Sequence, residues 1–389
     1  MTIYKGFFRN PEVILKAAIV HDWLTGMRGG EKVLEALCEV FPEADIFTLL
    51  HIPGSVSKII ESHNIKASFI QNLPAARRLY RSYLPLFPMA IEGLDLRGYD
   101  LVVSSSHCAA KGVIPPPDAL HISYIHTPMR YVWDMYREYF GREKGLKSKA
   151  LGLIAHYLRM WDSASSSRVD FFIANSAHVA KRVEKFYRRG SQVIHPPVDC
   201  GAFSVLKNPS RDYYLIVSAF APYKRLELAI SAFNRLGGRL IVAGKGPEEK
   251  RLKKMAGPNV EFSGWKPQDE LAAFYGNCRA LIFPGEEDFG IVPLEAASSG
   301  RPVIAFGKGG ALETILPLNN EQGYAPTGVF FREQTVGALI RAVRLFEDNE
   351  ERFEPASIRA HALKFDREIF KERVREFILS KCNGSSAGR

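Results

Sequence analysis

Two carboxylates, Glu287 and Glu295, stand eight positions apart on either side of a short loop that contains Gly290. Residues 280–284, before the loop, are apolar and predict a buried strand of a parallel sheet. The residues after the loop predict a helix, with Pro293 in its first turn. A strand, a loop and a helix N-terminus in this order form the place where α/β proteins hold phosphate groups.

Carboxylates on both sides of a phosphate site restrict the ligand. A carboxylate repels phosphate, but it accepts hydrogen bonds from hydroxyl groups. A ligand with phosphate in its middle and hydroxyls at both ends fits this pattern, and a nucleotide sugar is such a ligand. The alternative is a solvated acidic loop followed by a Glu that the helix macrodipole favours.

This segment resembles the E-x7-E motif of retaining glycosyltransferases of family four, which have the GT-B fold. The resemblance implies that Glu287 lies near the transferred sugar and has a catalytic role, whereas Glu295 holds the ribose. It also implies that Phe289, Gly290 and Ile291 contribute to the donor site.

Residues 218–225 follow a strand and precede a helix, and they contain Lys224 and Arg225. The family usually has an Arg five residues before this Lys, and the two clamp the diphosphate. Ala219 stands at that position here. We therefore expect Lys224 to carry the catalytic positive charge, with a solvated lysine as the alternative. Arg225 either supplies the missing charge or points outward from the helix.

Three further positions resemble donor-site or acceptor-site residues of the family. His126 lies at the end of a predicted strand and matches a histidine that many members of the family place against the donor sugar. The resemblance makes it a catalytic candidate. Gly29 and Gly30 match a glycine pair that faces the donor diphosphate or the acceptor. The alternatives are a structural histidine and a tight turn between strand and helix.

Two loops complete the donor site that the resemblance implies. Trp265 and Lys266 lie in the loop that cups the nucleobase in the family, and residues 307–310 resemble a Gly-rich loop that lines the donor pocket. A plain surface turn is the alternative for each loop.

Strand and helix patterns alternate along the whole chain, which predicts an α/β protein with two doubly wound parallel sheets. Helices are expected at residues 31–41 and 226–236. Strands are expected at residues 16–22, 100–104, 120–124, 171–174, 214–217, 239–243, 260–262, 280–283 and 302–305.

The break in the pattern after Pro196 and Pro197 predicts a domain boundary. Residues 1–198 are expected to form a Rossmann-like domain on the acceptor side. Residues 199–365 are expected to form a Rossmann-like domain that binds the nucleotide sugar. By resemblance, the two domains face each other across a cleft, and residues 366–389 form a helix that crosses back to the first domain, with a tail.

Composition limits the class of protein. The chain has 389 residues, is 46% hydrophobic and 24% charged, and contains no apolar run long enough to span a membrane, so no transmembrane helix is expected. Its five cysteines are scattered without a C-x-x-C pair, which predicts free thiols in a reducing cytoplasm and argues against a disulfide scaffold or a zinc site.

The net charge of +10 is spread over both halves of the chain, with three local basic clusters. The first contains Arg77, Arg78 and Arg81 beside Leu79, Tyr80, Tyr83, Leu84, Leu86 and Phe87. The second contains Arg142, Lys144, Lys147 and Lys149, and the third spans residues 181–189. Basic side chains next to apolar ones favour peripheral contact with an anionic membrane, such as the inner face of the cell membrane, and a solvated face is the alternative. No nucleic-acid motif is present, so no nucleic-acid partner is expected.

These patterns together predict a glycosyltransferase that moves a hexose to a hydroxyl of a glycan or lipid-linked glycan. The stretches around Lys224 and His126 look most like bacterial mannosyltransferases of O-antigen and exopolysaccharide assembly, which favours mannose from GDP-mannose. A UDP-hexose donor, a sugar-nucleotide epimerase and a binding protein of the same fold are the alternatives. D-x-D is absent, so the nucleotide sugar is expected as co-substrate, with no cofactor and no bound metal.

Overall fold

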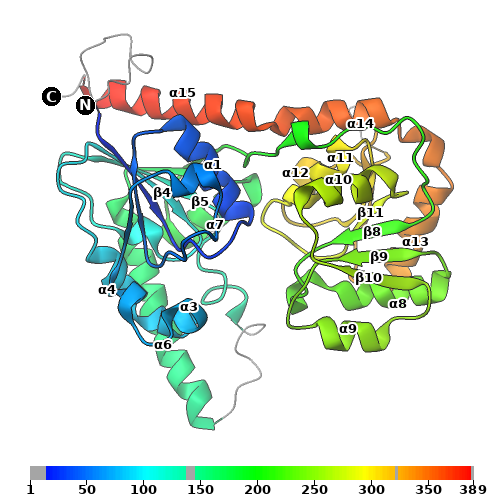
Figure 1. Cartoon of the computed structure of the whole chain (residues 1–389), viewed down its shortest axis with the longest axis horizontal. Coiled ribbons are helices and arrows are strands. Elements are labelled where there is room, and N and C mark those ends of the chain that lie inside the picture. The colour runs from blue at the N-terminus through cyan, green and yellow to red at the C-terminus, as the bar shows by residue number, and fades with distance from the viewer. Residues whose placement is uncertain (1–14, 137–144, 320–322, 387–389) are drawn as a thin grey trace. The chain divides into compact units, whose positions relative to one another are not determined.

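The computed structural model describes residues 15–136, 145–319 and 323–386. The chain divides into two compact units, Met1–Pro197 with Glu368–Arg389, and Val198–Arg367. Each unit is built on its own parallel sheet with helices on both faces (Figure 1). The predicted α/β class with two doubly wound sheets is confirmed.

The described part of the first unit contains a parallel sheet in the order β3-β2-β1-β4-β5-β6-β7. Along β1, Ala18 and Val20 face one hydrophobic core and Ala17 and Ile19 face another, because side chains alternate along a strand. Both faces of this sheet are therefore buried. The strands are β1 (Ala17–His21), β2 (Asp45–Thr48), β3 (Ile65–Ala67), β4 (Leu101–Ser106), β5 (Leu120–Ile125), β6 (Phe171–Ala174) and β7 (Ser191–Val193).

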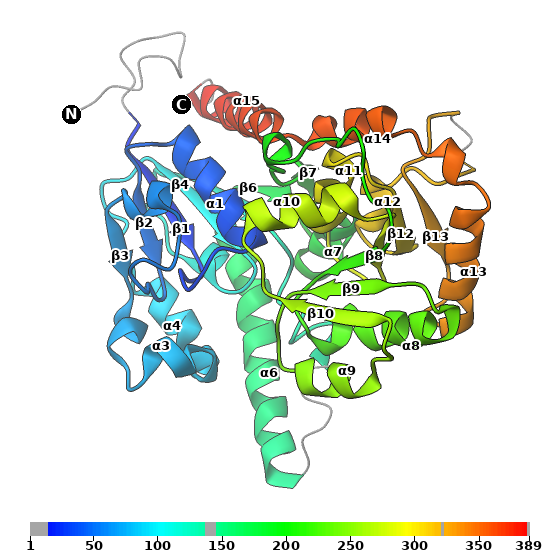
Figure 2. The ribbon, with the colours of Figure 1, turned by 45° about the vertical axis from the view of Figure 1, so that its right-hand side comes forward.

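Helices cover both faces of this sheet (Figure 2). The helices α4 and α6 pack on one face, and α1 and α15 pack on the other, where α15 contributes Phe370, Val374 and Ile378 to the core. The α-helices are α1 (Gly29–Val40), α2 (Lys58–Glu61), α3 (Ala76–Leu79), α4 (Phe87–Glu92), α6 (Gly145–Ser165), α7 (Ala177–Tyr187) and α15 (Arg367–Ser386). The 3₁₀ helices are η1 (Phe69–Asn72), η2 (Tyr80–Leu86), η3 (Ala110–Gly112) and η4 (Ser166–Arg168).

The second unit has a parallel sheet in the order β10-β9-β8-β11-β12-β13 within the described residues. Because β8 pairs with β11 as well as with β9, the strand order reverses at β8, and ligands bind such sheets at the carboxyl ends of the strands on either side of that point. The strands are β8 (Tyr214–Val217), β9 (Leu240–Ala243), β10 (Val260–Gly264), β11 (Leu281–Phe283), β12 (Val303–Phe306) and β13 (Gly328–Phe331).

Alternating side chains bury both faces of this sheet as well. Tyr214 and Ile216 pack with α8 and α13, whereas Leu215 packs with α10, α11 and α12. The α-helices are α8 (Leu226–Leu236), α9 (Glu249–Met255), α10 (Gln268–Asn277), α11 (Ile291–Ser298), α12 (Ala311–Thr314), α13 (Val336–Glu347) and α14 (Pro355–Ala362). The 3₁₀ helices are η5 (Cys200–Ala202), η6 (Pro222–Lys224), η7 (Glu350–Arg352) and η8 (Leu363–Phe365).

All nine strands expected from the sequence are present, with bounds shifted by at most a few residues. The strands β2, β3, β7 and β13 were not expected. They are short, and β3 and β7 lie at the edges of their sheet, where few residues are buried and the apolar pattern is weak. In the second basic cluster, Arg142 and Lys144 lie outside the described residues, whereas Lys147 and Lys149 are exposed on α6.

Candidate active site

Lys224 and Glu287, two residues that the sequence marks as catalytic, form an ion pair between Nζ and Oε1. Lys224 ends η6, which follows β8, and Glu287 lies between β11 and α11. Since β8 and β11 are parallel neighbours, their carboxyl ends bring these two side chains together. Gly285 permits the close approach, because a Cβ there would lie 3.1 Å from Lys224 Cα.

The Gly-rich loop at residues 307–310 packs directly on the loop that carries Glu287. The N–H of Gly310 donates to the carbonyl oxygen of Glu287 at 2.9 Å. A Cβ at Gly309 would clash with that oxygen, and a Cβ at Gly310 would clash with Phe289 Cα. Only glycines allow this contact, which fixes the backbone on which the Glu287 carboxylate is held.

Gly290 and Ile291 form the N-terminus of α11. Gly290 is the N-cap residue with φ +96°, a left-handed conformation that favours glycine, and Ile291 is the first helical residue. The side chain of Phe289 is buried in the hydrophobic core and contacts Phe365, so only its backbone can contribute to a ligand site. This arrangement leaves backbone N–H groups at the start of α11 that can meet an anion.

Glu295 lies in the second turn of α11 and is 8% exposed. The hydroxyl of Tyr275, in α10, donates to Glu295 Oε2 at 2.8 Å. Burial raises the pKa of Tyr275 well above its ordinary value, and the charge of Glu295 adds to that shift, so the hydroxyl stays a neutral donor. Tyr275 therefore orients a carboxylate that can accept hydrogen bonds from a ligand. The sequence did not single out Tyr275.

Arg225 adopts a left-handed conformation with φ +56° between η6 and α8. Its Nε donates to Glu227 Oε1 at 2.8 Å, and its Nη1 donates to Gln334 Oε1 at 3.4 Å. Gln334 in turn donates to the carbonyl oxygen of Pro284, which follows β11. The guanidinium is therefore tied to the carboxyl end of β11, beside the segment that leads to Glu287.

Trp265 and Lys266 follow β10. The indole of Trp265 is 62% exposed, and Lys245 Nζ lies 5.6 Å from its ring centre. Lys266 pairs with Glu270 in α10 at 2.6 Å. An exposed indole next to a lysine can stack on a planar ring, whereas the Lys266 charge is already compensated by its own helix.

In the first unit, Gly30 lies close to His126. A Cβ at Gly30 would lie 3.8 Å from His126 Nε2 and 3.6 Å from His21 Cε1. Gly29 and Gly30 begin α1, and His126 follows β5, so the carboxyl edge of this sheet brings the three predicted residues of the first unit together.

His126 is held by a series of side-chain contacts that runs through Ser105 to His21. Its Nε2 lies 2.8 Å from Ser105 Oγ, and Ser105 Oγ lies 3.1 Å from His21 Nδ1. The other nitrogen of His21, Nε2, faces the buried Glu31 carboxylate at 3.9 Å. Ser105 Oγ thus links the two imidazole rings, with donor and acceptor roles that follow the tautomers of His21 and His126.

The pKa shifts agree with a neutral His126. Burial lowers the pKa of His126 well below its ordinary value, and the positive charge of His107 adds to this. Burial raises the pKa of Glu31, but the neighbouring His21 outweighs it, and the net shift is downward. Glu31 is therefore ionised at neutral pH.

Asp22 is a fully buried carboxylate that follows His21 in the sequence. It accepts hydrogen bonds of 2.6 to 2.9 Å from four consecutive backbone N–H groups, at His107, Cys108, Ala109 and Ala110. It also pairs with His107 Nδ1 at 2.9 Å. Burial raises the pKa of Asp22, but His107 and these bonds bring it well below its ordinary value.

His107 was missed by the sequence analysis. Burial lowers its pKa, but the Asp22 charge outweighs burial and the net shift is upward, which favours an imidazolium. Its ring centre lies 6.2 Å from that of His126. The one available signal was its position after the carboxyl end of a strand, which many residues share.

Within residues 15–136, 145–319 and 323–386, no group of three or more His, Cys, Asp and Glu side chains is placed to hold a metal ion. No helix in the same ranges is long and apolar enough to cross a bilayer.

Family models match nearly the whole chain in two successive parts. Residues 27–201 match the model described as Glycosyltransferase Family 4. Residues 202–362 match the model described as Glycosyl transferases group 1. The boundary between the two matches lies close to the boundary between the two units.

Several curated relatives are similar to parts of the chain. The sulfoquinovosyl transferase SQD2 of Arabidopsis thaliana is 33% identical over 148 residues, 37% of this chain and 28% of that protein. The O-antigen chain mannosyltransferase C of Escherichia coli is 32% identical over 101 residues, 24% of this chain and 27% of that protein. The alpha-1,3/1,6-mannosyltransferase ALG2 of Kluyveromyces lactis is 22% identical over 354 residues, 76% of this chain and 68% of that protein. The chain thus spans less than half the length of the first relatives it matches.

Solved structures share the fold over almost the whole chain. Anabaena HepE, in complex with UDP and glucose, has a TM-score of 0.68 at 16% identity and covers 94% of this chain and 99% of its own. A sucrose-phosphate synthase of Thermosynechococcus elongatus has a TM-score of 0.69 at 16% identity and covers 95% and 100%. With both units matched by family models and the fold shared at full length, the chain belongs to the GT-B glycosyltransferases, with a family 4 domain followed by a group 1 domain.

Proposed function

We propose that the protein is a retaining glycosyltransferase that moves mannose from GDP-mannose to a hydroxyl of a glycan or lipid-linked glycan, in the synthesis of a cell-surface polysaccharide. The observation that carries the proposal is the arrangement in the second unit. A lysine and a carboxylate meet at the carboxyl ends of β8 and β11, and the N-terminus of α11 begins just beyond them, with the buried Glu295 one turn further on.

Lys224 stabilises the departing diphosphate in the proposed mechanism. Its ammonium is held by Glu287, and the backbone N–H groups at Gly290 and Ile291 add positive potential at the same loop. The bond between the anomeric carbon and the phosphate oxygen breaks, and the acceptor oxygen attacks on the same face. The leaving phosphate takes the acceptor proton, so no strong base is required. Glu287 positions the sugar.

His126 is proposed to contact the donor sugar. The Nδ1 atom of its neutral ring can share a hydrogen bond with a sugar hydroxyl, which both donates and accepts. Gly30 lies beside this ring, and the start of α1, where Gly29 and Gly30 stand, can meet a phosphate or the acceptor.

The choice of mannose rests on the relatives. The Escherichia coli and Kluyveromyces lactis proteins are described as mannosyltransferases, which supports a mannosyl donor. The structure of HepE contains UDP and glucose, which supports a UDP-hexose as the second candidate. Trp265 offers a stacking surface for either base and does not discriminate between them.

Labelled donors test the function. The full chain is incubated with labelled GDP-mannose or UDP-glucose, a bacterial lipid extract as acceptor pool, and either excess EDTA or Mg²⁺. We expect label from GDP-mannose to enter the lipid fraction, in equal amounts with EDTA and with Mg²⁺. The product is expected to keep the α configuration of the donor. Activity that disappears in EDTA and returns with Mg²⁺ or Mn²⁺ contradicts the metal-free mechanism. A donor epimerised without transfer indicates an epimerase.

Glu295→Ala is expected to weaken donor binding by about 1.5–3 kcal/mol, the range for a hydrogen bond to a charged group. The reason is that Glu295 is buried, oriented by Tyr275, and placed one turn after the phosphate loop. Calorimetry with the donor measures the change. Tyr275→Phe, which keeps the carboxylate and removes its orienting bond, is expected to have a smaller effect. Equal affinity of Glu295→Ala and wild type, in a folded variant, rejects the ribose assignment.

Peripheral contact with an anionic membrane is a further proposal, and it places the protein at the inner face of the cell membrane. Arg77, Arg78 and Arg81 are exposed on α3 and η2; Leu79 on α3 is 51% exposed, and Met89 on α4, which packs against η2, is 57% exposed. Each Arg near such a surface contributes about 1 kcal/mol. Replacing the three arginines with Gln is expected to abolish flotation with anionic liposomes. Equal flotation with neutral liposomes argues against the charge-based contact.

Of the apolar residues that the sequence grouped with these arginines, Leu79 is exposed, but the others are buried or partly buried. Tyr80 and Phe87 are buried in the core of the first unit, and Tyr83 and Leu84 are partly buried against it. They cannot insert into a bilayer without unfolding this part of the unit. The apolar part of the proposed surface is therefore Leu79 and Met89.

A further inference from the structure

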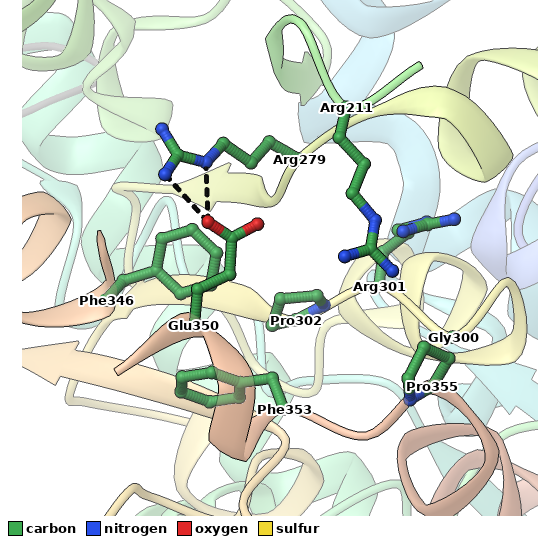
Figure 3. Close-up of a pocket in the computed structure, with 9 residues that line it drawn as sticks. All are labelled: Arg211, Arg279, Gly300, Arg301, Pro302, Phe346, Glu350, Phe353 and Pro355. Atoms are coloured by element: carbon green, nitrogen blue, oxygen red, sulfur yellow. Dashed lines mark hydrogen bonds and ion pairs between the residues drawn. The ribbon is translucent and has the colours of Figure 1, made fainter. Parts of the chain in front are cut away.

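Three arginines stand directly before three neighbouring strands of the second unit. Arg211 precedes β8, Arg279 precedes β11 and Arg301 precedes β12. These strands are adjacent and parallel in the sheet order, so the arginines gather at its amino edge. The Lys224–Glu287 pair lies at the opposite, carboxyl edge of the same sheet. Figure 3 shows the three arginines around one pocket.

Arg279 is compensated by acidic partners. It pairs with Glu347 at 2.9 Å and with Glu350 at 2.7 Å. The positive charge of Arg279 is therefore balanced within the protein, and it offsets part of the negative charge of Glu347 and Glu350. The pocket retains the positive charge of the other two arginines.

Arg301 is a buried cation with unsatisfied donors. Its side chain is 2% exposed, and its Nε and Nη2 atoms have no hydrogen-bond acceptor among the described residues. Buried arginines are normally paired, because a desolvated guanidinium without an acceptor is costly. Burial lowers the pKa of Arg301, and the neighbouring charge of Arg211 lowers it further. Neighbouring groups such as Cys278 and Glu350 act in the opposite direction, but the net shift is downward.

Arg211 adds a second charge at the rim. It is exposed, and its backbone has φ +53°, a left-handed conformation that is strained for arginine. The structure records no ion pair of this side chain within the described ranges. Two guanidinium groups of like charge thus line one small pocket, where they repel each other unless an anion lies between them.

The rest of the pocket wall is apolar and rigid. It is formed by Gly300, Pro302, Phe346, Phe353 and Pro355. Gly300 has φ +69°, and a Cβ there would lie 2.8 Å from Pro355 Cβ, so the end of α11 fits closely against the start of α14. Apolar walls strengthen the attraction between an arginine and an anion, since they lower the local dielectric.

We propose that this pocket binds a phosphate group, either inorganic phosphate or the terminal phosphate of a sugar phosphate, through Arg211 and Arg301. A guanidinium presents a planar fork of N–H donors that matches an oxyanion, and two such groups match a tetrahedral phosphate with several acceptor oxygens. Glu350 excludes anions from the part of the pocket next to Arg279. The site is separate from the donor site, and the proposal does not depend on the proposed function.

Thermal unfolding of the full chain tests the site. Inorganic phosphate and mannose 6-phosphate are titrated separately at constant ionic strength, with chloride as the replaced anion. A saturable rise in Tm is expected, about 3–6 °C at ten times the Kd. The ligand with the lower Kd identifies the source of the phosphate group. The titration is repeated in Lys224→Ala, where the rise is expected to persist because the donor site lies at the other edge of the sheet.

Two variants and a matched control locate the binding. Arg301→Met is expected to abolish the phosphate-dependent rise, and it is expected to be at least as stable as the wild type without phosphate, because it removes an unpaired buried charge. Arg211→Gly, which suits the left-handed backbone and serves if Arg301→Met does not fold, is expected to raise the Kd at least tenfold. Arg188→Gly removes an equally exposed arginine with φ +55° from the first unit and is expected to change nothing.

The opposite results overturn the proposal. If neither phosphate compound gives a saturable rise in the wild type, the pocket is not a phosphate site. The same conclusion follows if Arg211→Gly and Arg188→Gly respond alike to phosphate. A rise that disappears in Lys224→Ala assigns the binding to the donor site instead.

Discussion

Lys224→Ala is expected to lower kcat by about 10²–10³, the usual effect of losing a preorganised charge at a developing anion. Lys224 pairs with Glu287 at the carboxyl ends of β8 and β11, and Ala219 stands where the resemblance to the family implies an Arg. The ammonium is proposed to act mainly when the diphosphate departs. The variant should therefore lower kcat more than it raises the KM for the donor, as measured by steady-state kinetics.

Lys253→Ala provides the control for this variant. Lys253 is an exposed lysine on α9 that pairs with Glu249, so its loss removes the same charge away from the site. Its kcat is expected to match the wild type. A near-normal kcat in Lys224→Ala would move the role to Arg225 or to the N-terminus of α11 alone.

Asp22→Asn is expected to destabilise the first unit by about 3–5 kcal/mol, the cost of breaking a buried charged network on one side. The Asp22 carboxylate accepts from four backbone N–H groups and pairs with His107. An Asn keeps one oxygen, so its NH₂ group would face backbone donors. It would also leave the His107 charge without a counterion. Denaturant unfolding measures the loss.

The control for Asp22→Asn is Asp95→Asn. Asp95 pairs with Arg97 in full exposure, where an ion pair contributes little to stability. The midpoint of unfolding is expected to remain unchanged in this control. An equal effect of the two substitutions would show that Asp22 does not organise the first unit.

The ion pair between Asp22 and His107 predicts how the stability of the first unit depends on pH. The pKa of Asp22 is lower in the folded state than its unfolded value of about 4, so its contribution is present above that pH and is lost as the pH falls. The pKa of His107 is raised, so its contribution is present below about pH 6.5 and is lost as the pH rises through the folded pKa. Asp22→Asn is expected to reduce both slopes in unfolding measured across pH.

Local patterns predicted the central part of each sheet and the loop that carries Glu287. Buried strands such as β9 and β11 are continuous apolar runs, and the motif from Glu287 to Glu295 is contained within a few residues. The pattern fails where burial is partial. β3 is a three-residue edge strand with two exposed side chains, so it carries almost no apolar signal.

The missed site residues are those whose roles depend on long-range contacts. Tyr275 reaches Glu295 from another helix, and His107 reaches Asp22 across two neighbouring strands. Neither contact has a local spacing that a sequence could reveal. For Arg225, the sequence left two alternatives open, and its contacts with Glu227 and Gln334 keep it close to the site. A role for Arg225 as the second phosphate ligand remains a proposal.

The position of α15 has a consequence for synthesis on the ribosome. Phe370, Val374 and Ile378 complete the core of the first unit beside Leu37 and Tyr124, although the whole second unit is translated between them. At about 5–20 residues per second, the nascent first unit exposes that apolar surface for about 10–30 s. The second unit can fold earlier, because its strands and helices are contiguous in the chain. The nascent first unit is therefore expected to be the part that chaperones protect.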